Sequence, residues 1–195
     1  LLFGRAEAGY TDPVSSGVVY NEILDGRQYI LNGGTTIDTN INAGGWQIVS
    51  SGGVASNTII NFTGRQDVST GGMVDGTVIN KDAGQNVFSG GVANNTTINS
   101  TGRQDIYNKG VASVTIVNSG GLQDLYDGAI ASGTTVSTGG GQNIFSKGVA
   151  VSTIVSGGQQ KISIGGTASN TNIYLGGWQI IYSSGTAIAN TVASD

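Results

Sequence analysis

Gly26-Arg27-Gln28-Tyr29-Ile30 is the first copy of a pattern that repeats along most of this chain. Its glutamine returns every 19 residues, with a single interval of 18. The later copies of this glutamine are Gln47, Gln66, Gln85, Gln104, Gln123, Gln142, Gln160 and Gln179. A fixed period of this length is typical of repeat architectures, in which each unit packs against the next. From residue 28 onward we therefore predict one elongated array of about nine units.

Within one unit, the residue type depends on the distance from the glutamine, which we call the offset. Offset 2 is Val, Ile or Leu, offset 8 is mostly Ala, offset 11 is Thr in eight units, and offset 13 is Ile or Val. Gly-rich turns follow at offsets 5 and 6 and again before the next glutamine. Short β-branched runs bounded by Gly, Asn and Ser indicate strands, and no segment has a sustained helical periodicity.

Nineteen residues hold two or three short strands with their turns, so one unit is predicted to be one coil. Coils stacked roughly 4.8 Å apart pair through parallel ladders. We therefore predict an all-β fold, a right-handed parallel β-helix (a solenoid) of about nine 19-residue coils. Residues 28–195 would form this array. Residues 1–27 are expected to be a flanking segment and a degenerate N-terminal capping coil, since end repeats of a solenoid are atypical.

Identical residues in register are expected to support the stack. Asn recurs at offset 14 in five consecutive units, where its amide can hydrogen-bond along the rod. These residues are Asn42, Asn61, Asn80, Asn99 and Asn118. The 18-residue interval removes one position from the turn at Ser156-Gly157-Gly158, which should leave the strand register intact.

The composition excludes several functions. Charged residues are 10% of the chain, the net charge is −4, and no Lys/Arg run occurs, which argues against nucleic acid as a partner. There is no His and no Cys, which excludes a His/Cys metal site and a Ser-His hydrolase. Phosphate-loop and calcium-roll motifs are absent too. We expect no cofactor, no metal and no catalytic residue.

The clearest copy of the unit runs from Gly45 to Asn61 and reads Gly-Trp-Gln-Ile-Val-Ser-Ser-Gly-Gly-Val-Ala-Ser-Asn-Thr-Ile-Ile-Asn. It resembles the passenger repeats of AIDA-type self-associating autotransporter adhesins, the family of AIDA and the TibA adhesin. The resemblance covers roughly residues 26–192. It rests on the shared period together with the Gln, Gly-Gly, Thr and Ile positions.

The resemblance implies a protein of the Gram-negative cell surface, exported through an outer-membrane barrel that this fragment does not contain. Such passengers mediate auto-aggregation, biofilm formation and, in some members, host-cell adhesion. The implied partners are the chain itself, between cells, and host-cell surfaces or glycans. Some members carry O-linked heptose on serine, added by a dedicated heptosyltransferase. The matching turn serines are Ser50, Ser51, Ser69, Ser89 and Ser146.

One group of residues on the predicted outer wall is a candidate contact surface. Offset 2 should point inward, so offsets 1 and 3 should point outward, with offset 18 beside them. Offset 1 carries Asp or Asn, offset 3 is aromatic in four consecutive coils, and offset 18 repeatedly carries Arg or Trp. The candidate residues are Asp105, Asp124, Arg103, Tyr107, Tyr126, Phe88 and Phe145.

Several interpretations of this surface are open. Aromatic neighbours across a ladder stabilise a sheet by about 0.2–1 kcal/mol each, so the column can be purely structural. Contiguous exposed aromatics also mark interfaces, here between copies of the chain or with a glycan. Asp105 and Asp124, roughly 5 Å apart, could instead be the paired acids of a polysaccharide-cleaving β-helix. Such sites normally need loops that protrude from the coils, and the chain has no long insertion, so we expect no enzyme.

Overall fold

The computed structural model describes residues 5–6, 11–174 and 176–193 of the chain. The regular elements in these ranges are all β-strands. No helix that could cross a membrane is found among them. The fold class predicted from the repeat, an all-β solenoid, is therefore confirmed.

The strands form three parallel sheets, and each coil contributes one strand to each sheet. Sheet 1 contains β2 (Thr11–Val14), β5 (Arg27–Ile30), β8 (Trp46–Val49), β11 (Arg65–Val68), β14 (Gly84–Val87), β17 (Arg103–Ile106), β20 (Leu122–Leu125), β23 (Gly141–Ile144), β26 (Gln159–Ile162) and β29 (Trp178–Ile181). Sheet 2 contains β3 (Val18–Tyr20), β6 (Thr35–Ile37), β9 (Val54–Ser56), β12 (Met73–Asp75), β15 (Val92–Asn94), β18 (Val111–Ser113), β21 (Ile130–Ser132), β24 (Val149–Val151), β27 (Thr167–Ser169) and β30 (Thr186–Ile188). Sheet 3 contains β1 (Arg5–Ala6), β4 (Ile23–Leu24), β7 (Asn40–Ile41), β10 (Ile59–Ile60), β13 (Val78–Ile79), β16 (Thr97–Ile98), β19 (Ile116–Val117), β22 (Thr135–Val136), β25 (Ile154–Ser156), β28 (Asn172–Tyr174) and β31 (Thr191–Val192).

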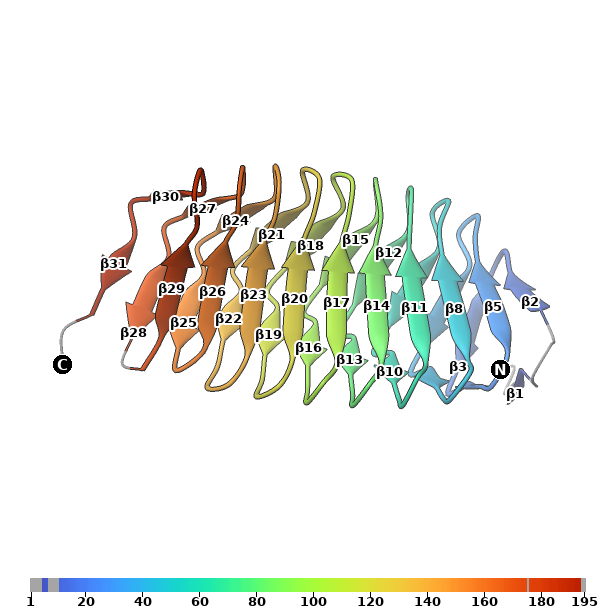
Figure 1. The fold of residues 1–195 in the computed structure, drawn as a ribbon. Coiled ribbons are helices and arrows are strands. Elements are labelled where there is room, and N and C mark those ends of the chain that lie inside the picture. Colours follow the sequence, from blue (N-terminus) through green and yellow to red (C-terminus); the bar gives the residue numbers. More distant parts are fainter. Residues whose placement is uncertain (1–4, 7–10, 175, 194–195) are drawn as a thin grey trace.

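The coils wind right-handed along one rod (Figure 1). The 27 strands from β5 to β31 make nine coils of three strands. Strands β2, β3 and β4 pair in parallel with β5, β6 and β7, so residues 11–24 have the same three-strand geometry as the coils that follow.

Like positions of successive coils lie above one another. Gln85 pairs with Gln104. Across the 18-residue interval, Gln142 still pairs with Gln160. The missing residue falls in the turn before β26, so the predicted preservation of register is confirmed.

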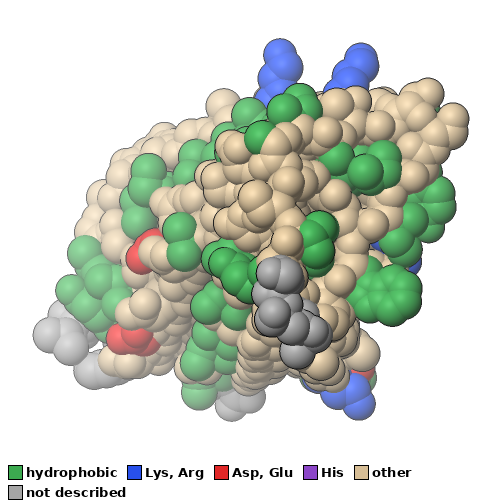
Figure 2. All heavy atoms as spheres, turned by 90° about the vertical axis from the view of Figure 1, so that its left-hand side faces the viewer, with side chains coloured by type: hydrophobic (Ala, Val, Ile, Leu, Met, Phe, Trp, Pro, Cys, Tyr) green, Lys and Arg blue, Asp and Glu red, His purple; other side chains and the backbone are tan. Residues whose placement is uncertain are grey.

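The core consists of two apolar stripes along the rod. One stripe combines Val, Ile or Leu of sheet 1 with small residues of sheet 2, and the other is mainly Ile and Val of sheet 3. Ile162 is fully buried, whereas the equivalent residue of the last coil, Ile181, is 49% exposed. Figure 2 looks onto this end of the rod and shows its apolar side chains in the open. The next coil thus covers the apolar core side chains of each coil, so an isolated coil would expose its core to water.

A column of buried glutamines, which we call the glutamine ladder, runs beside the apolar stripes. From Gln47 to Gln179, each Nε2 donates to the Oε1 of the glutamine one coil earlier, over 2.6–3.0 Å. Most of the buried offset-11 threonines add bonds, as where Thr134 Oγ1 donates to Gln123 Oε1 at 3.0 Å, whereas the Thr39 and Thr58 hydroxyls have no partner among the described residues. The interior can hold these amides because their donors and acceptors are paired.

The predicted asparagine ladder is also present, at the corner after sheet 3. Each Nδ2 donates to the Oδ1 of the preceding asparagine, over 2.9–3.3 Å. The first residue of the column, Asn42, donates to Asp25 Oδ1 at 3.1 Å. These bonds link five successive coils at their surface.

The corner between sheets 2 and 3 places offset 10 in left-handed backbone. Asn57 and Asn95 occupy it at φ of 54° and 51°, but Val114 adopts the same conformation at 54°. A β-branched residue is disfavoured there by roughly 1–2 kcal/mol. Val114 is also 54% exposed, so it contributes little packing. We expect Val114→Asn to raise the free energy of unfolding by about 1 kcal/mol in urea titrations.

Val111 provides the control for this prediction. It lies in β18 of the same coil, is half-buried, and is not among the residues with positive φ. Asn is a poor strand residue, so Val111→Asn should lower stability. A Val114→Asn variant that unfolds at or below the wild-type midpoint would contradict the strain argument.

Candidate functional site

The outer face of sheet 1 brings together the seven residues predicted as a contact surface. Along β17 the side chains alternate, so Gln104 and Ile106 are buried while Arg103 and Asp105 face outward. The aromatic residues follow directly after β14, β17, β20 and β23. We call this set the charged aromatic face: Phe88, Arg103, Asp105, Tyr107, Asp124, Tyr126 and Phe145.

The four rings form one continuous stack along the rod. Neighbouring ring centroids lie 5.5, 5.0 and 4.7 Å apart, with interplanar angles of 14°, 9° and 2°. Both faces of Tyr107 and of Tyr126 are therefore covered by neighbouring rings. A partner would meet ring edges and the tyrosine hydroxyls, since a sugar cannot stack on a covered ring. Only the outer faces of the two end rings have no ring partner in the stack.

Arg103 ties the two central acids and one tyrosine together. Its Nε donates to Asp105 Oδ1 at 2.7 Å, and its Nη2 donates to Asp124 Oδ2 at 2.6 Å. The same Nη2 lies 2.9 Å from the Tyr126 hydroxyl oxygen. The Tyr126 hydroxyl in turn donates to Asp124 Oδ2 over 3.2 Å. The guanidinium is thus held rigidly across two coils.

The two acids occupy equivalent positions but differ in environment. Asp124 is 2% exposed and also accepts a hydrogen bond from Asn143 Nδ2 at 2.7 Å, whereas Asp105 is half-buried. Burial raises the pKa of the Asp124 carboxyl, against the opposing effects of Asn143 and Arg103. Burial, together with the nearby carboxylates, raises the pKa of Tyr126 to about 12. Its hydroxyl therefore stays protonated and remains a donor at neutral pH.

A second cluster of the same kind lies nearer the N-terminus. Asp67 is 6% exposed and accepts bonds from Arg65 Nε at 2.8 Å and from Trp46 Nε1 at 3.0 Å. The Trp46 ring is sandwiched between the guanidinium groups of Arg27 and Arg65, at 4.5 and 5.0 Å from its centroid. The sequence showed that Arg27, Trp46 and Arg65 share one offset, but not that they contact one another.

A hollow of about 490 Å³ separates the two clusters. It lies at Gly84, the offset-18 residue of its coil, which has no side chain to fill the space. Arg65 and Arg103, the offset-18 residues of the two adjacent coils, line its two sides. The single Gly between two Arg at this offset was visible in the sequence, but the hollow was not predicted. Its rim carries Asp82 as well as the arginines, so it is not a purely cationic site.

The five candidate serines lie at the corner between sheets 1 and 2. Ser51, Ser89 and Ser146 are exposed, and Ser50 and Ser69 are half-buried. The corner borders the aromatic stack: Ser89 and Ser146 directly follow two of its rings, and Ser50 and Ser69 occupy the offset of the stack in earlier coils. No group of three metal-ligating side chains is found in residues 5–6, 11–174 and 176–193.

Comparison with known proteins agrees with this architecture. A family model described as the adhesin of the bacterial autotransporter system, probable stalk, matches residues 23–84 and 80–140. Among solved structures, the chain is similar to a TibC-catalyzed hyper-glycosylated TibA fragment, with 38% identity and a TM-score of 0.85. That match covers 98% of this chain and 76% of the TibA chain. No curated protein matches. The chain therefore belongs to the AIDA family of autotransporter adhesins and consists of their passenger repeats.

Proposed function

We propose that this chain is a surface-exposed segment of a self-associating adhesin, and that its charged aromatic face holds cells together. Auto-aggregation, biofilm formation and attachment to host-cell surfaces or glycans would follow from such contacts. The observation that carries the proposal is the rigid Arg103 network beside a stack of four rings. An ordered surface of this kind loses little side-chain entropy when a partner binds.

The face is suited to meeting a second copy of itself. It carries an arginine and two carboxylates within one network, so a two-fold arrangement can bring opposite charges of two copies together. The chain has a net charge of −4 with only 10% charged residues, which limits repulsion between neighbouring rods. Weak contacts repeated along two aligned rods would multiply into strong adhesion.

A binding role is better supported than a catalytic one. Both candidate acids, Asp105 and Asp124, are engaged by Arg103 at 2.6–2.7 Å. Asp124 is almost completely buried, so a glycosidic oxygen could not approach its carboxyl group. We therefore propose that the face is not a polysaccharide-cleaving site.

We also propose that the corner serines are acceptors for O-linked sugar, added by a heptosyltransferase. This rests on the similarity to the hyper-glycosylated TibA fragment and on the exposure of Ser51, Ser89 and Ser146. A sugar at this corner would border the charged aromatic face and could shield it or extend it.

The proposal is tested by placing like charges on the face. We expect a Phe88→Lys, Phe145→Lys double variant displayed on cells to settle at least about fivefold more slowly than wild type. The substitutions alter the two end rings, while the central Tyr107–Tyr126 contact and the Arg103 network are kept. Lysines at the edges of facing rods would repel one another and exclude close contact. The readout is the turbidity of standing suspensions, with display measured by antibody.

A matched control carries the same charges on another face. Val54 and Val111 are half-buried at the starts of β9 and β18 in sheet 2, and they are separated by the same 57 residues as the two phenylalanines. The Val54→Lys, Val111→Lys variant should settle like wild type. If the two variants are slowed equally, or if neither is slowed, the interface does not lie on the charged aromatic face.

A further inference from the structure

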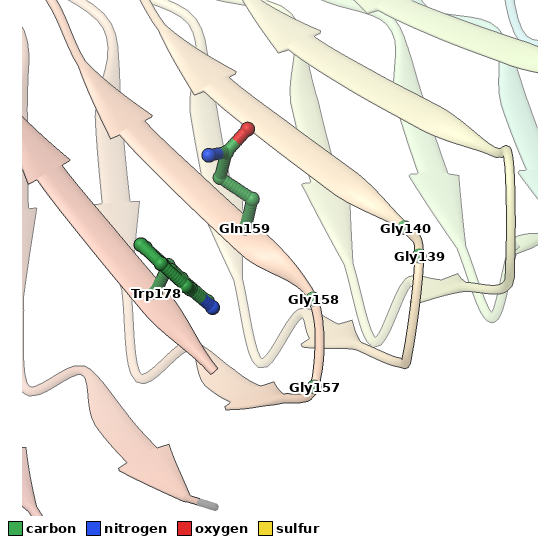
Figure 3. A pocket seen from close by; sticks show the side chains of 6 residues that line it. All are labelled: Gly139, Gly140, Gly157, Gly158, Gln159 and Trp178. Carbon is green, nitrogen blue, oxygen red and sulfur yellow. The ribbon is translucent and has the colours of Figure 1, made fainter. Parts of the chain in front are cut away.

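A second hollow lies at the 18-residue interval, the single departure from the 19-residue period in the array from residue 28 onward. It has a volume of about 350 Å³ and is lined by Gly139, Gly140, Gly157, Gly158, Gln159 and Trp178 (Figure 3). Four residues separate Val155 from Gln160, whereas five separate Val136 from Gln142 in the coil before. The shorter turn is therefore recessed relative to its predecessor. We call the resulting hollow the glycine notch.

The floor of the notch is bare backbone. Gly157 has a φ of 71°, and a Cβ on it would lie 2.4 Å from Thr138 Oγ1. A Cβ on Gly158 would lie 2.5 Å from the carbonyl oxygen of Ser137. Side chains are thus excluded from the floor, and a ligand can approach the main chain closely.

The shortened turn also differs from its predecessor in its backbone hydrogen bonds. In the preceding turn, the Gly140 amide donates to Ser137 O at 2.9 Å. Within the part of the chain that the structure describes, the Gly158 amide makes no corresponding bond to Val155 O. Among the described residues, the shortened turn therefore lacks the turn hydrogen bond of its predecessor.

The walls of the notch offer an aromatic ring and an amide. Trp178 is 65% exposed, and among the described residues its indole makes no ring or cation–π contact. The other tryptophan, Trp46, has guanidinium groups on both faces. The Gln159 side chain makes no hydrogen bond within the same described ranges, and it extends from the strand beside Trp178 (Figure 3). No lining residue is charged.

We propose that the glycine notch binds one ring of a neutral carbohydrate. A pyranose has an apolar C–H face, which suits an open indole, and hydroxyl groups at its rim, which both donate and accept hydrogen bonds. The Gln159 amide provides a matching donor and acceptor at the same hollow. Its volume is near the lower end of the range for small-molecule sites, which fits one ring of a chain. The inference does not depend on the proposed self-association.

The experiment uses the fluorescence of Trp178. The chain has two tryptophans, so a Trp46→Phe variant reports on Trp178 alone. This variant is titrated with cellotetraose, mannotetraose and galactotetraose. We expect a saturable change in emission with at least one of them, with a dissociation constant of roughly 1 mM. Adding Gln159→Ala should weaken that binding about fivefold, as expected for the loss of one hydrogen bond.

A second arm measures binding without fluorescence, by calorimetry on otherwise wild-type protein. Trp178→Ala should abolish the heat of binding while leaving the unfolding midpoint unchanged, since the residue is mostly exposed. Equal binding by Trp178→Ala, or no saturable response to any of the three sugars, would overturn the proposal. A response to a polyproline peptide in the absence of any response to sugars would overturn it in favour of a peptide site.

Discussion

A Gln104→Leu variant is expected to lose roughly 2–6 kcal/mol of the free energy of unfolding, although leucine has nearly the same size. In the wild type, Gln104 Nε2 donates to Gln85 Oε1 at 2.6 Å, and Gln104 Oε1 accepts from Gln123 Nε2 at 2.8 Å. The substitution leaves the buried acceptor Gln85 Oε1 and the buried donor Gln123 Nε2 without these partners. Each unpaired group costs about 1–3 kcal/mol of the free energy of unfolding. Guanidinium titration followed by far-UV circular dichroism measures the loss.

Gln104→Glu separates hydrogen bonding from shape. A charged carboxylate can accept from Gln123 but has no proton for Gln85. Burial should raise the pKa of the introduced carboxyl above its ordinary value, so the folded state holds the proton more tightly than the unfolded state. Stability should therefore be greatest at low pH and fall as the pH rises through that raised pKa. A loss independent of pH would contradict this reasoning.

Gln159→Leu is the matched control for both ladder variants. Gln159 precedes the buried Gln160 on the same strand, but its half-buried side chain makes no hydrogen bond in the described ranges. Its replacement should change stability by no more than about 0.5 kcal/mol. Equal losses at Gln104 and Gln159 would show that the ladder contributes nothing specific.

Gly72→Ala is expected to have the second largest effect, a loss of roughly 2–4 kcal/mol. A Cβ at this position would lie 2.2 Å from the carbonyl oxygen of Val49 in the coil before. Neither group is flexible, so the whole turn would have to move and the neighbouring ladder bonds would weaken. The same denaturant titration measures the effect.

Gly84→Ala tests the explanation for Gly72. The nearest atom to a Cβ on Gly84 is Arg103 O at 4.0 Å, and Gly84 is not among the glycines with positive φ. Alanine should be neutral there or stabilise by about 0.5 kcal/mol, because it restricts the unfolded chain. If both alanines destabilised equally, coil-to-coil contact would not be the reason that Gly72 is a glycine.

Much of the fold could be predicted because every coil of a solenoid has the same pattern of strands and turns. The glutamine period gave the coil length, the β-branched offsets gave the inward positions, and the Asn column gave one ladder. The burial of the glutamines themselves was harder to predict. Gln is usually exposed, and only the stacked geometry shows that each amide finds its partner one coil away.

The candidate site was predicted in outline but not in detail. Sequence alternation placed Asp105 and Asp124 on one outer face, and the structure agrees. Their different burial was not predictable, because it depends on neighbouring side chains such as Asn143 and Tyr126. The glycine notch was missed for a similar reason. From the shortened turn we predicted that the strand register is preserved. We did not predict that the shorter turn opens a hollow beside Trp178.

The glutamine ladder has a consequence for how such a chain can vary in length. Each amide donates toward the N-terminus and accepts from the following coil, so every junction between coils presents the same chemistry. If one whole coil were lost or duplicated by recombination, the new junction would match the old ones, whereas a partial coil would interrupt the ladder. The length of the rod can therefore change in steps of roughly 4.8 Å, one coil at a time, while the contacts in its core stay the same.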